Sequence, residues 1–358
     1  MKRWNFRGGM LILGMLLLLT GCSSKSKMPE MTGQIYLYGE AHGNEQILER
    51  EYELWEDYYT NHGMRHLFIE WSYFSAELLN VWMQEEDDEI IEIIFDNASE
   101  ALGYGSSTMD FYKKIKANCP ETIFHGTDVG HQYDTTGTLY LEYLSNIGLT
   151  DSEQYELAEE AIQQGKIFYE DLGEITINKA IFRENKLVEN FAREYEKLNG
   201  EDVMGIYGST HVYLDSLNYS GEITNMATQL SETYVDKVHS EDLQWWLKDI
   251  EPERTEIVHI NEKEYEISFF GIFEADPAYF PNYKYIEFGR IENAYEDFKT
   301  CEASGDMLAV GFYPMNVETS HVYVLDYTLH DGTKVRQYHY YRGLKVRTDS
   351  VTEEFWIE

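Results

Sequence analysis

The sequence is poor in basic residues. Its 358 residues include 28 Lys and Arg against 65 Asp and Glu, a formal net charge of −37. A surface this acidic repels phosphate backbones, so nucleic acid is not expected as a partner. The same imbalance argues against a basic patch that docks on anionic lipid.

Cysteine is also scarce, which excludes several kinds of site. The only three cysteines are Cys22, Cys119 and Cys301, and they form no Cys-x-x-Cys motif and no Cys/His spacing typical of zinc sites. Because Cys119 and Cys301 fall in different predicted domains, we predict two free thiols.

Only one long uncharged apolar run is present, and it lies at the start of the chain. It spans Gly8 to Leu19, after Lys2, Arg3 and Arg7 and before Thr20-Gly21-Cys22. This order is typical of a secretory signal, and the run is too short for a good membrane-spanning helix. The small residues directly before the cysteine resemble a lipobox.

The lipobox resemblance implies that residues 1–22 are a lipoprotein signal peptide and that Cys22 is lipidated. Residues 23–32 are then a polar tether, and acyl chains hold the protein on the cell membrane, facing away from the cytoplasm. The alternative is an ordinary cleaved signal with an incidental cysteine.

Residues 33–245 alternate between strand-like and helix-like patterns, which predicts a mainly parallel sheet with crossover helices. The predicted strands are 34–38, 65–69, 122–126 and 203–207. The predicted helices are 45–59, 75–86, 89–97, 109–117, 151–164 and 174–198.

From residue 254 to 358 the pattern becomes β-rich. Segments 256–259 and 265–273 form one predicted hairpin, and 322–329 and 334–341 form another, around an Asp-Gly turn. We also predict a helix over 291–301, ended with the help of Gly305, and a junction at 240–252. The fold class is therefore α/β with a smaller C-terminal β-rich domain of unknown role.

Unusual polar residues follow the predicted strands. Glu40 and His42 follow the first strand, Glu70 the second, Asp128 and His131 the third, and His211 the fourth. Because ligands bind at the carboxyl ends of strands in open α/β sheets, we expect these side chains to converge. A His paired with Glu suits general acid–base chemistry or metal binding. Taken singly, each residue also has a structural explanation, such as a turn cap or a rim salt bridge.

Together these residues resemble a superfamily. The motifs are Gly-Glu-Ala-His-Gly-Asn at 39–44, Phe-Ile-Glu at 68–70, Gly-Ser-Thr-His at 208–211 and the helix from Arg183 to Asn190. They are similar to motifs of the erythromycin esterase-like, haem-uptake ChaN-like and TraB/Tiki proteins. The resemblance covers roughly residues 33–235.

The resemblance implies divergent activities. Erythromycin esterase-like members are hydrolases with a His base and no required metal, and Tiki-like members resemble metal-dependent proteases. ChaN-like members bind haem, and TraB-like members curb peptide pheromones. By position, His42 is the base or a metal ligand, Glu70 its carboxylate partner or a ligand, and His211 the second His. Glu40 orients or protonates, and Arg183 binds an anionic group or orients a carboxylate.

Three hypotheses follow. The first is a membrane-anchored hydrolase of an ester or amide bond in a small molecule or peptide. If it uses a metal, His42, Glu70 and His211 are the expected ligands for Mn²⁺, Co²⁺ or Zn²⁺. The second is a non-catalytic lipoprotein that binds haem or another small molecule. The third is an interaction protein that uses the Tyr-rich β domain. A Gly-x-Ser-x-Gly elbow is absent, so we interpret Ser209 as a turn residue.

Overall fold

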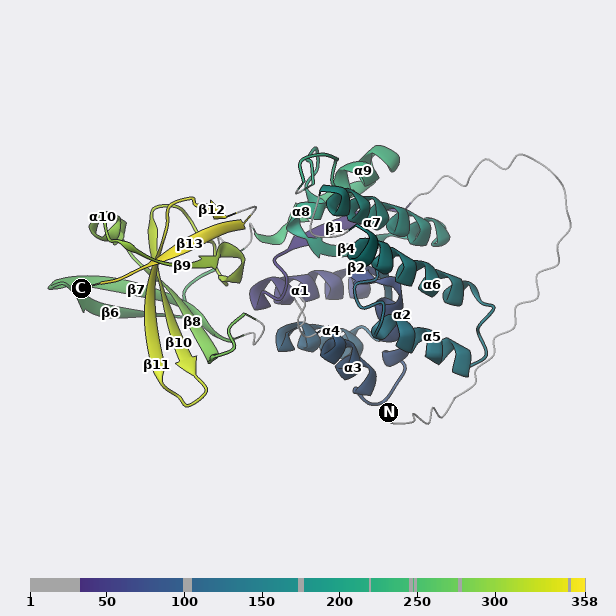
Figure 1. Ribbon diagram of the computed structural model, residues 1–358, viewed down its shortest axis with the longest axis horizontal. Helices are drawn as coiled ribbons and strands as arrows, with labels where there is room; N and C mark the ends of the chain where they lie inside the picture. The colour runs from purple at the N-terminus through teal and green to yellow at the C-terminus, as the bar shows by residue number, and fades with distance from the viewer. Residues whose placement is uncertain are drawn as a thin grey trace, which may run out of the picture.

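The structure is a computed structural model that describes residues 33–98, 105–172, 177–218, 220–244, 247, 250–275, 279–346 and 349–357. Its strands form a parallel sheet within residues 35–242 and an antiparallel sheet within residues 254–355 (Figure 1). The predicted fold class is therefore confirmed. The predicted leader 1–22, with Cys22, and the tether 23–32 lie outside the described residues, and the exact domain boundaries stay a prediction.

The parallel sheet has the strand order β3-β2-β4-β1-β5, and every neighbouring pair in it is parallel. Its strands are β1 (Ile35–Glu40), β2 (His66–Ser72), β3 (Ile123–Asp128), β4 (Val203–Gly208) and β5 (Val238–Asp242). Because all strands run in one direction, their carboxyl ends lie at one edge of the sheet.

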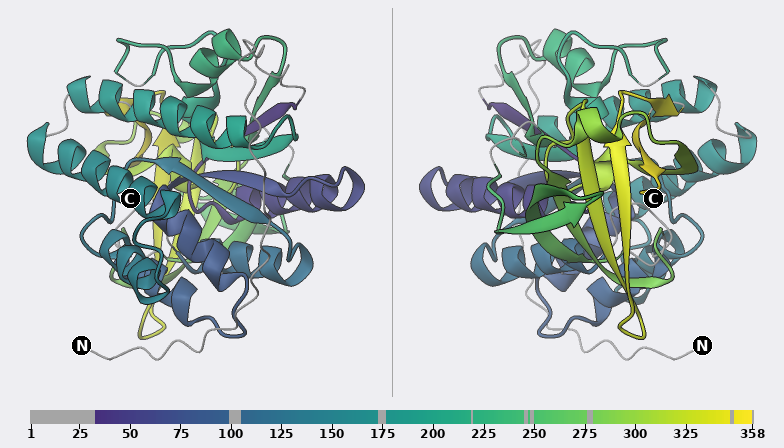
Figure 2. Two further views of the ribbon diagram at one scale, coloured as in Figure 1. Left: turned by 90° about the vertical axis from the view of Figure 1, so that its right-hand side faces the viewer. Right: turned by 90° about the vertical axis from the view of Figure 1, so that its left-hand side faces the viewer.

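Helices cover both faces of this sheet because its side chains alternate. In β2, Leu67 and Ile69 belong to one apolar core and Phe68 to the other. The first core packs α1 (Glu45–Asn61), α2 (Tyr73–Trp82), α3 (Glu89–Asn97), α4 (Ser106–Asn118), α5 (Thr136–Asn146) and α6 (Glu153–Lys166). The second packs α7 (Ile177–Lys197), α8 (Ser209–Val212) and α9 (Met226–Thr233). Figures 1 and 2 show the two layers, with α7 and α9 above the sheet and α1 and α4 below it in Figure 1.

The turn from β1 into α1 is short and well defined. Gly43 has φ 73°, a conformation that glycine adopts without steric cost. The Asn44 side chain accepts hydrogen bonds from the backbone N–H groups of Gln46 (3.1 Å) and Ile47 (3.2 Å), which caps the helix. This turn holds His42 at the end of the strand.

The antiparallel sheet has the order β12-β13-β11-β10-β8-β7-β6, and β9 also pairs with β13. Its strands are β6 (Arg254–Ile260), β7 (Lys263–Glu274), β8 (Tyr283–Ile291), β9 (Ala303–Ala309), β10 (His321–Leu329), β11 (Lys334–Tyr341), β12 (Lys345–Val346) and β13 (Asp349–Phe355). Asn261 and Glu262, at φ 50° and 63°, form the first hairpin turn, and Gly332, at φ 87°, lies in the second. Both predicted hairpins are confirmed.

The helix predicted near residues 291–301 is present but much shorter than expected. Ile291 ends β8, where it pairs with Ile267 and Val322, and only Tyr295–Phe298 form a short helix, α10. Ile291 and Phe298 both pack into the apolar core of the β domain, the first from a strand and the second from a single helical turn. Their apolar side chains are therefore spaced along the chain as in one longer helix. Gly305, expected to end the helix, lies in β9 at φ 101°.

Three further differences concern the elements of the α/β part. Strand β5 occupies the start of the predicted junction, and its polar, partly exposed sequence shows no strand-like alternation of apolar residues. Helix α5 was not predicted, and β2 runs three residues beyond Ile69, the last residue of the predicted strand. Cys119 and Cys301 are both free, as predicted. No helix among the described residues is long and apolar enough to cross a membrane.

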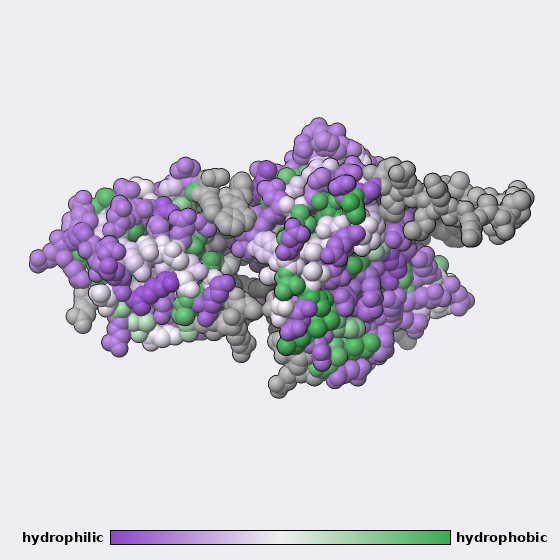
Figure 3. Space-filling model, turned by 90° about the horizontal axis from the view of Figure 1, so that it is seen from above, coloured by the Kyte–Doolittle hydropathy of each residue, from purple (hydrophilic) through white to green (hydrophobic). Residues whose placement is uncertain are grey.

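The β-rich part contacts the α/β part next to the β1–α1 turn. The Asn44 side-chain amide donates to the carbonyl of Tyr313 (3.0 Å), and the Ser106 hydroxyl donates to Glu274 (3.1 Å). Hydrophilic residues predominate on the face shown in Figure 3, with hydrophobic patches on the α/β part. The β domain therefore lies against the turn that carries His42.

Candidate active site

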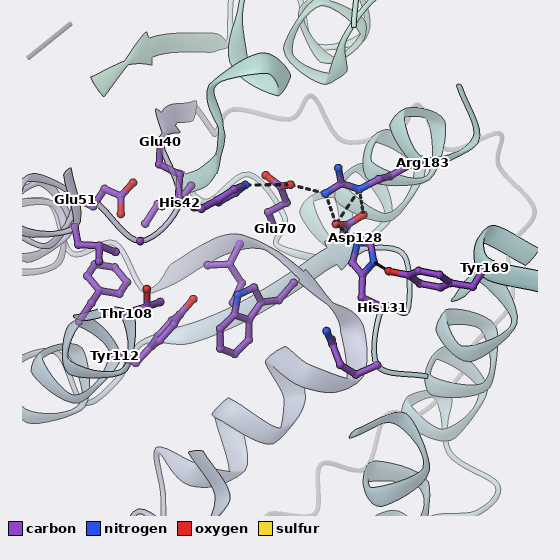
Figure 4. A pocket seen from close by; sticks show the side chains of 17 residues that line it. Glu40, His42, Glu51, Glu70, Thr108, Tyr112, Asp128, His131, Tyr169 and Arg183 are labelled. Atoms are coloured by element: carbon purple, nitrogen blue, oxygen red, sulfur yellow. Dashed lines mark hydrogen bonds and ion pairs between the residues drawn. The ribbon is translucent and has the colours of Figure 1, made fainter. Parts of the chain in front are cut away.

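The carboxyl ends of the parallel strands open into a cavity of about 340 Å³ (Figure 4). This volume lies within the range of small-molecule sites, roughly 300–1,000 Å³. Six of the seven side chains predicted from the sequence line it, namely Glu40, His42, Glu70, Asp128, His131 and Arg183. The structure thus brings these candidates together, and every residue that lines the cavity belongs to the α/β part.

His42 lies at the centre of the cavity between two carboxylates. Its Nδ1 is 2.8 Å from Glu40 Oε1, and its Nε2 is 3.8 Å from Glu70 Oε1. Since a carboxylate only accepts hydrogen bonds, Nδ1 carries a proton and Nε2 faces Glu70. Burial alone would lower the pKa of His42, but Glu40 and Glu70 outweigh it and raise the pKa to about 9.

Glu70 is held by donors on both oxygens. The strand register shifts after Ile69, and the Glu70 carboxylate accepts from the Gly208 backbone N–H (2.5 Å) and from Arg183. A Cβ on Gly208 would lie 3.0 Å from His42 Nε2, so this position leaves little room for any other residue. Burial alone would raise the pKa of Glu70, but the surrounding cationic groups outweigh it and lower the pKa to about 2.

Arg183 reaches the site from α7 and bridges two carboxylates. Its Nε lies 3.0 Å from Asp128 Oδ1 and its Nη2 lies 2.6 Å from Asp128 Oδ2, while Nη2 also bonds Glu70. Helix α7 is fixed to β3 because the Asn190 amide donates to the Thr127 carbonyl (2.9 Å). Although burial opposes its charge, Asp128 and Glu70 raise the pKa of Arg183 well above its usual value.

His211 belongs to the cluster but does not line the cavity. It is 3% exposed, its Nδ1 is 3.0 Å from Glu184 Oε1, and its Nε2 is 3.7 Å from Glu70 Oε1. Burial would lower the pKa of His211, but Glu70 and Glu184 raise it. Glu184 also accepts from the Met226 backbone N–H (2.6 Å). His211 therefore acts on the site through Glu70, and Glu184, which we had not selected as a candidate, orients it.

His131 connects Asp128 to a tyrosine. Its Nε2 is 2.9 Å from Asp128 Oδ2 and its Nδ1 is 2.5 Å from the Tyr169 hydroxyl. Tyr169 lies in a single π-helical segment, η1 (Ile167–Asp171), a feature often found at functional sites. We call this side of the cavity, with Glu70, Asp128, Arg183, His131 and Tyr169, the arginine end. Sequence reasoning missed Tyr169, because no spacing in the chain links it to His131.

The opposite side, the Glu51 end, has a different character. It comprises Glu51 and Leu48 of α1 and Thr108 and Phe111 of α4. Within the described part of the chain, both carboxyl oxygens of Glu51 and the hydroxyl of Thr108 are buried and make no hydrogen bond. Figure 4 shows Glu51 and Thr108 on one side of His42, with Arg183 and Asp128 on the other. Sequence reasoning missed Glu51, although its position four residues after Ile47 places a charge on the apolar stripe of α1.

Ser209 is the first residue of the short helix α8 and not a turn residue, as we had interpreted it from the sequence. Its hydroxyl donates to Asp242 (2.7 Å) and accepts from the Gln244 side chain (2.8 Å). These partners hold the start of α8 rather than activate a nucleophile.

The three expected metal ligands do not fit a divalent cation. Both oxygens of Glu70 are engaged by donors, and the Arg183 guanidinium lies 3.5 Å from His211 Nε2, between the expected ligands. Within the described residues, no group of three or more His, Cys, Asp or Glu side chains is placed to hold a metal ion.

The cavity fits haem equally poorly. Four carboxyl groups line it, those of Glu40, Glu51, Glu70 and Asp128. Haem is a largely apolar macrocycle that carries carboxylates of its own, and its sites are shaped by an axial ligand in a pocket of matched polarity.

Comparisons with known proteins find similar solved structures. No protein-family model and no curated protein matches the chain. A mutant of the erythromycin esterase EreC, in its open conformation, aligns with a TM-score of 0.42 at 11% identity over 59% of this chain and 69% of that one. A Bacillus cereus protein aligns with a TM-score of 0.41 at 11% identity, over 59% of this chain and 65% of that one. A succinoglycan biosynthesis protein (TM-score 0.41, 13% identity) is covered over 64% by 57% of this chain. The chain thus spans about two thirds of these structures, and the family resemblance stays a prediction.

Proposed function

We propose that the protein is a hydrolase of an ester or amide bond, in which His42 activates water. The observation that carries this proposal is the orientation of the imidazole. Glu40 fixes the proton on Nδ1 at 2.8 Å and leaves Nε2 facing the cavity beside Glu70. A carboxylate-oriented histidine with one nitrogen directed into a cavity is the arrangement that general-base catalysis requires.

The reaction balances with residues of this chain alone. His42 Nε2 takes a proton from water as the water oxygen attacks the carbonyl carbon, and it returns that proton to the leaving group as the bond breaks. Arg183 lines the cavity and carries a permanent charge, so it stabilises the oxyanion that develops. No step is routed through a metal or haem.

The raised pKa of His42 sets the pH at which this base works. With a pKa of about 9, His42 is mostly protonated at neutral pH in the ligand-free site. The fraction of neutral base, and therefore the rate, increases as the pH rises toward 9.

We also propose that Cys22 anchors the protein to the outer side of the cell membrane, where it meets a small-molecule or peptide substrate. The support is the order of charged, apolar and small residues before Cys22. Cys22→Ala should move the protein from the membrane fraction to the soluble fraction, and retention of the variant in membranes contradicts lipidation.

The hydrolase proposal is tested with the full chain and a panel of chromogenic esters and anilides. We expect His42→Gln to lower kcat/KM by roughly 10²–10⁴-fold, because proton transfer by a positioned base contributes about that much. His259→Gln is the matched control, since the His259 side chain is 70% exposed in the β domain. Equal activity of wild type and His42→Gln rules out His42 as the base.

A further inference from the structure

The Glu51 end of the cavity contains a buried carboxyl group without a partner. Glu51 is 0% exposed, and neither of its oxygens makes a hydrogen bond within the described part of the chain. The Thr108 hydroxyl, beside the same cavity, is also buried and unpartnered. Unsatisfied buried polar groups are rare in folded proteins because each one costs stability. A side chain that does not contribute a bond to the fold is available for a ligand.

The charges around Glu51 favour an incoming cation. Burial and the neighbouring Glu40 carboxylate raise the pKa of Glu51 well above its usual value, and a bound cation would oppose both effects. The two cationic groups of the cavity, His42 and Arg183, are engaged by Glu40, Glu70 and Asp128. No cation among the described residues pairs with Glu51.

The walls of this end suit a cation with an apolar arm. Leu48 and Phe111 line the cavity beside Glu51 and Thr108. An ammonium group gains from the face of an aromatic ring, and its alkyl chain packs against aliphatic side chains. The net charge of −37 also attracts cations toward the protein.

We propose that the Glu51 end is a subsite for a substituted ammonium group of the substrate, bound by the Glu51 carboxylate and the Thr108 hydroxyl. This inference rests on the proposed hydrolase function, because it assigns the substrate a cationic group beside the bond that His42 attacks. When an ammonium ion binds, its N–H groups donate to the Glu51 carboxylate, and any proton that the carboxyl group held passes to solvent. When the amine arrives uncharged, the proton passes from Glu51 to the amine and none is released.

Isothermal titration calorimetry on the full chain tests the subsite without any turnover. The probes are 2-phenylethylammonium and its neutral analogue 2-phenylethanol, titrated at pH 7 in two buffers of different ionisation enthalpy. We expect the ammonium to bind roughly tenfold or more tightly than the alcohol, with a net proton release that is absent in Glu51→Gln.

Glu51→Gln keeps the shape of the side chain and removes the charge, so it should lose that preference. Thr108→Val should weaken ammonium binding by a smaller factor. Glu53→Gln, on the exposed side of α1, is the matched control and should bind like wild type. Equal binding of the two probes, or an unchanged preference in Glu51→Gln, overturns the subsite.

The two proposals fail in different ways. If His42→Gln leaves hydrolysis unchanged while ammonium binding still requires Glu51, only the hydrolase proposal is contradicted. Hydrolysis that depends on His42, together with ammonium binding that ignores Glu51, removes the subsite alone.

Discussion

The two ends of the cavity treat buried carboxyl groups in opposite ways. At the arginine end, Asp128 is 1% exposed and Glu70 lies beside it, and both bond Arg183. At the Glu51 end, a carboxyl that is 0% exposed has no partner in the described part of the chain. The pKa of Glu70 is lowered to about 2, whereas that of Glu51 is raised well above its usual value.

This difference shows that burial alone does not decide the charge of a carboxyl group. Burial raises the pKa at both ends, and only the nearby cations reverse it at the arginine end. The arginine end is therefore assembled before a ligand arrives, whereas the Glu51 end is completed by one.

The largest effect should come from Arg183→Met, which leaves Glu70 and Asp128 buried without their cation. We expect a loss of about 3–5 kcal/mol in the free energy of unfolding at pH 7, measured by urea denaturation. The low pKa of Glu70 contributes stability above its unfolded value near 4.5 that is lost as the pH falls toward 2, and the variant should show a weaker dependence, because His211 and His42 still lower this pKa.

Lys186→Met on the same helix is the control for Arg183→Met. Lys186 pairs with Glu189, whose side chain is 61% exposed, so the change should cost at most about 1 kcal/mol. Similar losses in both variants contradict the assignment of Arg183 as the cation that stabilises the site.

Glu51→Leu should have the opposite sign. Because the carboxyl lacks a partner, its replacement by an apolar side chain of similar size should stabilise the ligand-free protein by about 1–3 kcal/mol. Thermal and urea unfolding of the variant and wild type measure this difference. Destabilisation by Glu51→Leu means that the carboxyl is satisfied in solution, and the contrast between the two ends then disappears.

The smallest effect should come from Glu40→Gln, because Glu40 affects the pKa of both His42 and Glu51. It removes an opposite charge from His42 and a like charge from Glu51, so the pKa of both groups should fall. Since His42 contributes stability below pH 6.5 that is lost as the pH rises through about 9, the variant should show a flatter stability profile over that range.

Histidine NMR titration measures the His42 shift in Glu40→Gln directly. One pKa unit corresponds to about 1.4 kcal/mol. Glu53→Gln serves again as the control, and an unchanged His42 pKa in Glu40→Gln would falsify the role of Glu40.

Much of the cavity lining could be predicted from the sequence because of a simple geometric rule. Parallel strands share one carboxyl edge, so residues that follow them meet without any knowledge of packing. Glu40 and Asp128 are the last residues of β1 and β3, Glu70 lies two residues before the end of β2, and the structure places all three in one cavity.

The remainder depended on contacts between elements that are far apart in sequence. Tyr169 reaches His131 only because a π-helical turn follows α6, and Glu51 and Thr108 meet through the packing of α1 on α4. His211 follows its strand as predicted, yet it lies behind Glu70 rather than in the cavity. Side-chain depth of this kind is a tertiary property that strand order does not encode.

Asn44 makes hydrogen bonds in both domains. Asn44 lies two residues after His42. Its side-chain oxygen caps the N-terminus of α1, and its side-chain amide donates a hydrogen bond to the carbonyl of Tyr313 in the β domain. A chimera that exchanged the β domain for another fold would need to present a carbonyl at the same place, or the turn that carries His42 would keep an unsatisfied donor. The C-terminal domain therefore cannot be exchanged for another fold without loss of a hydrogen bond at the turn that carries His42.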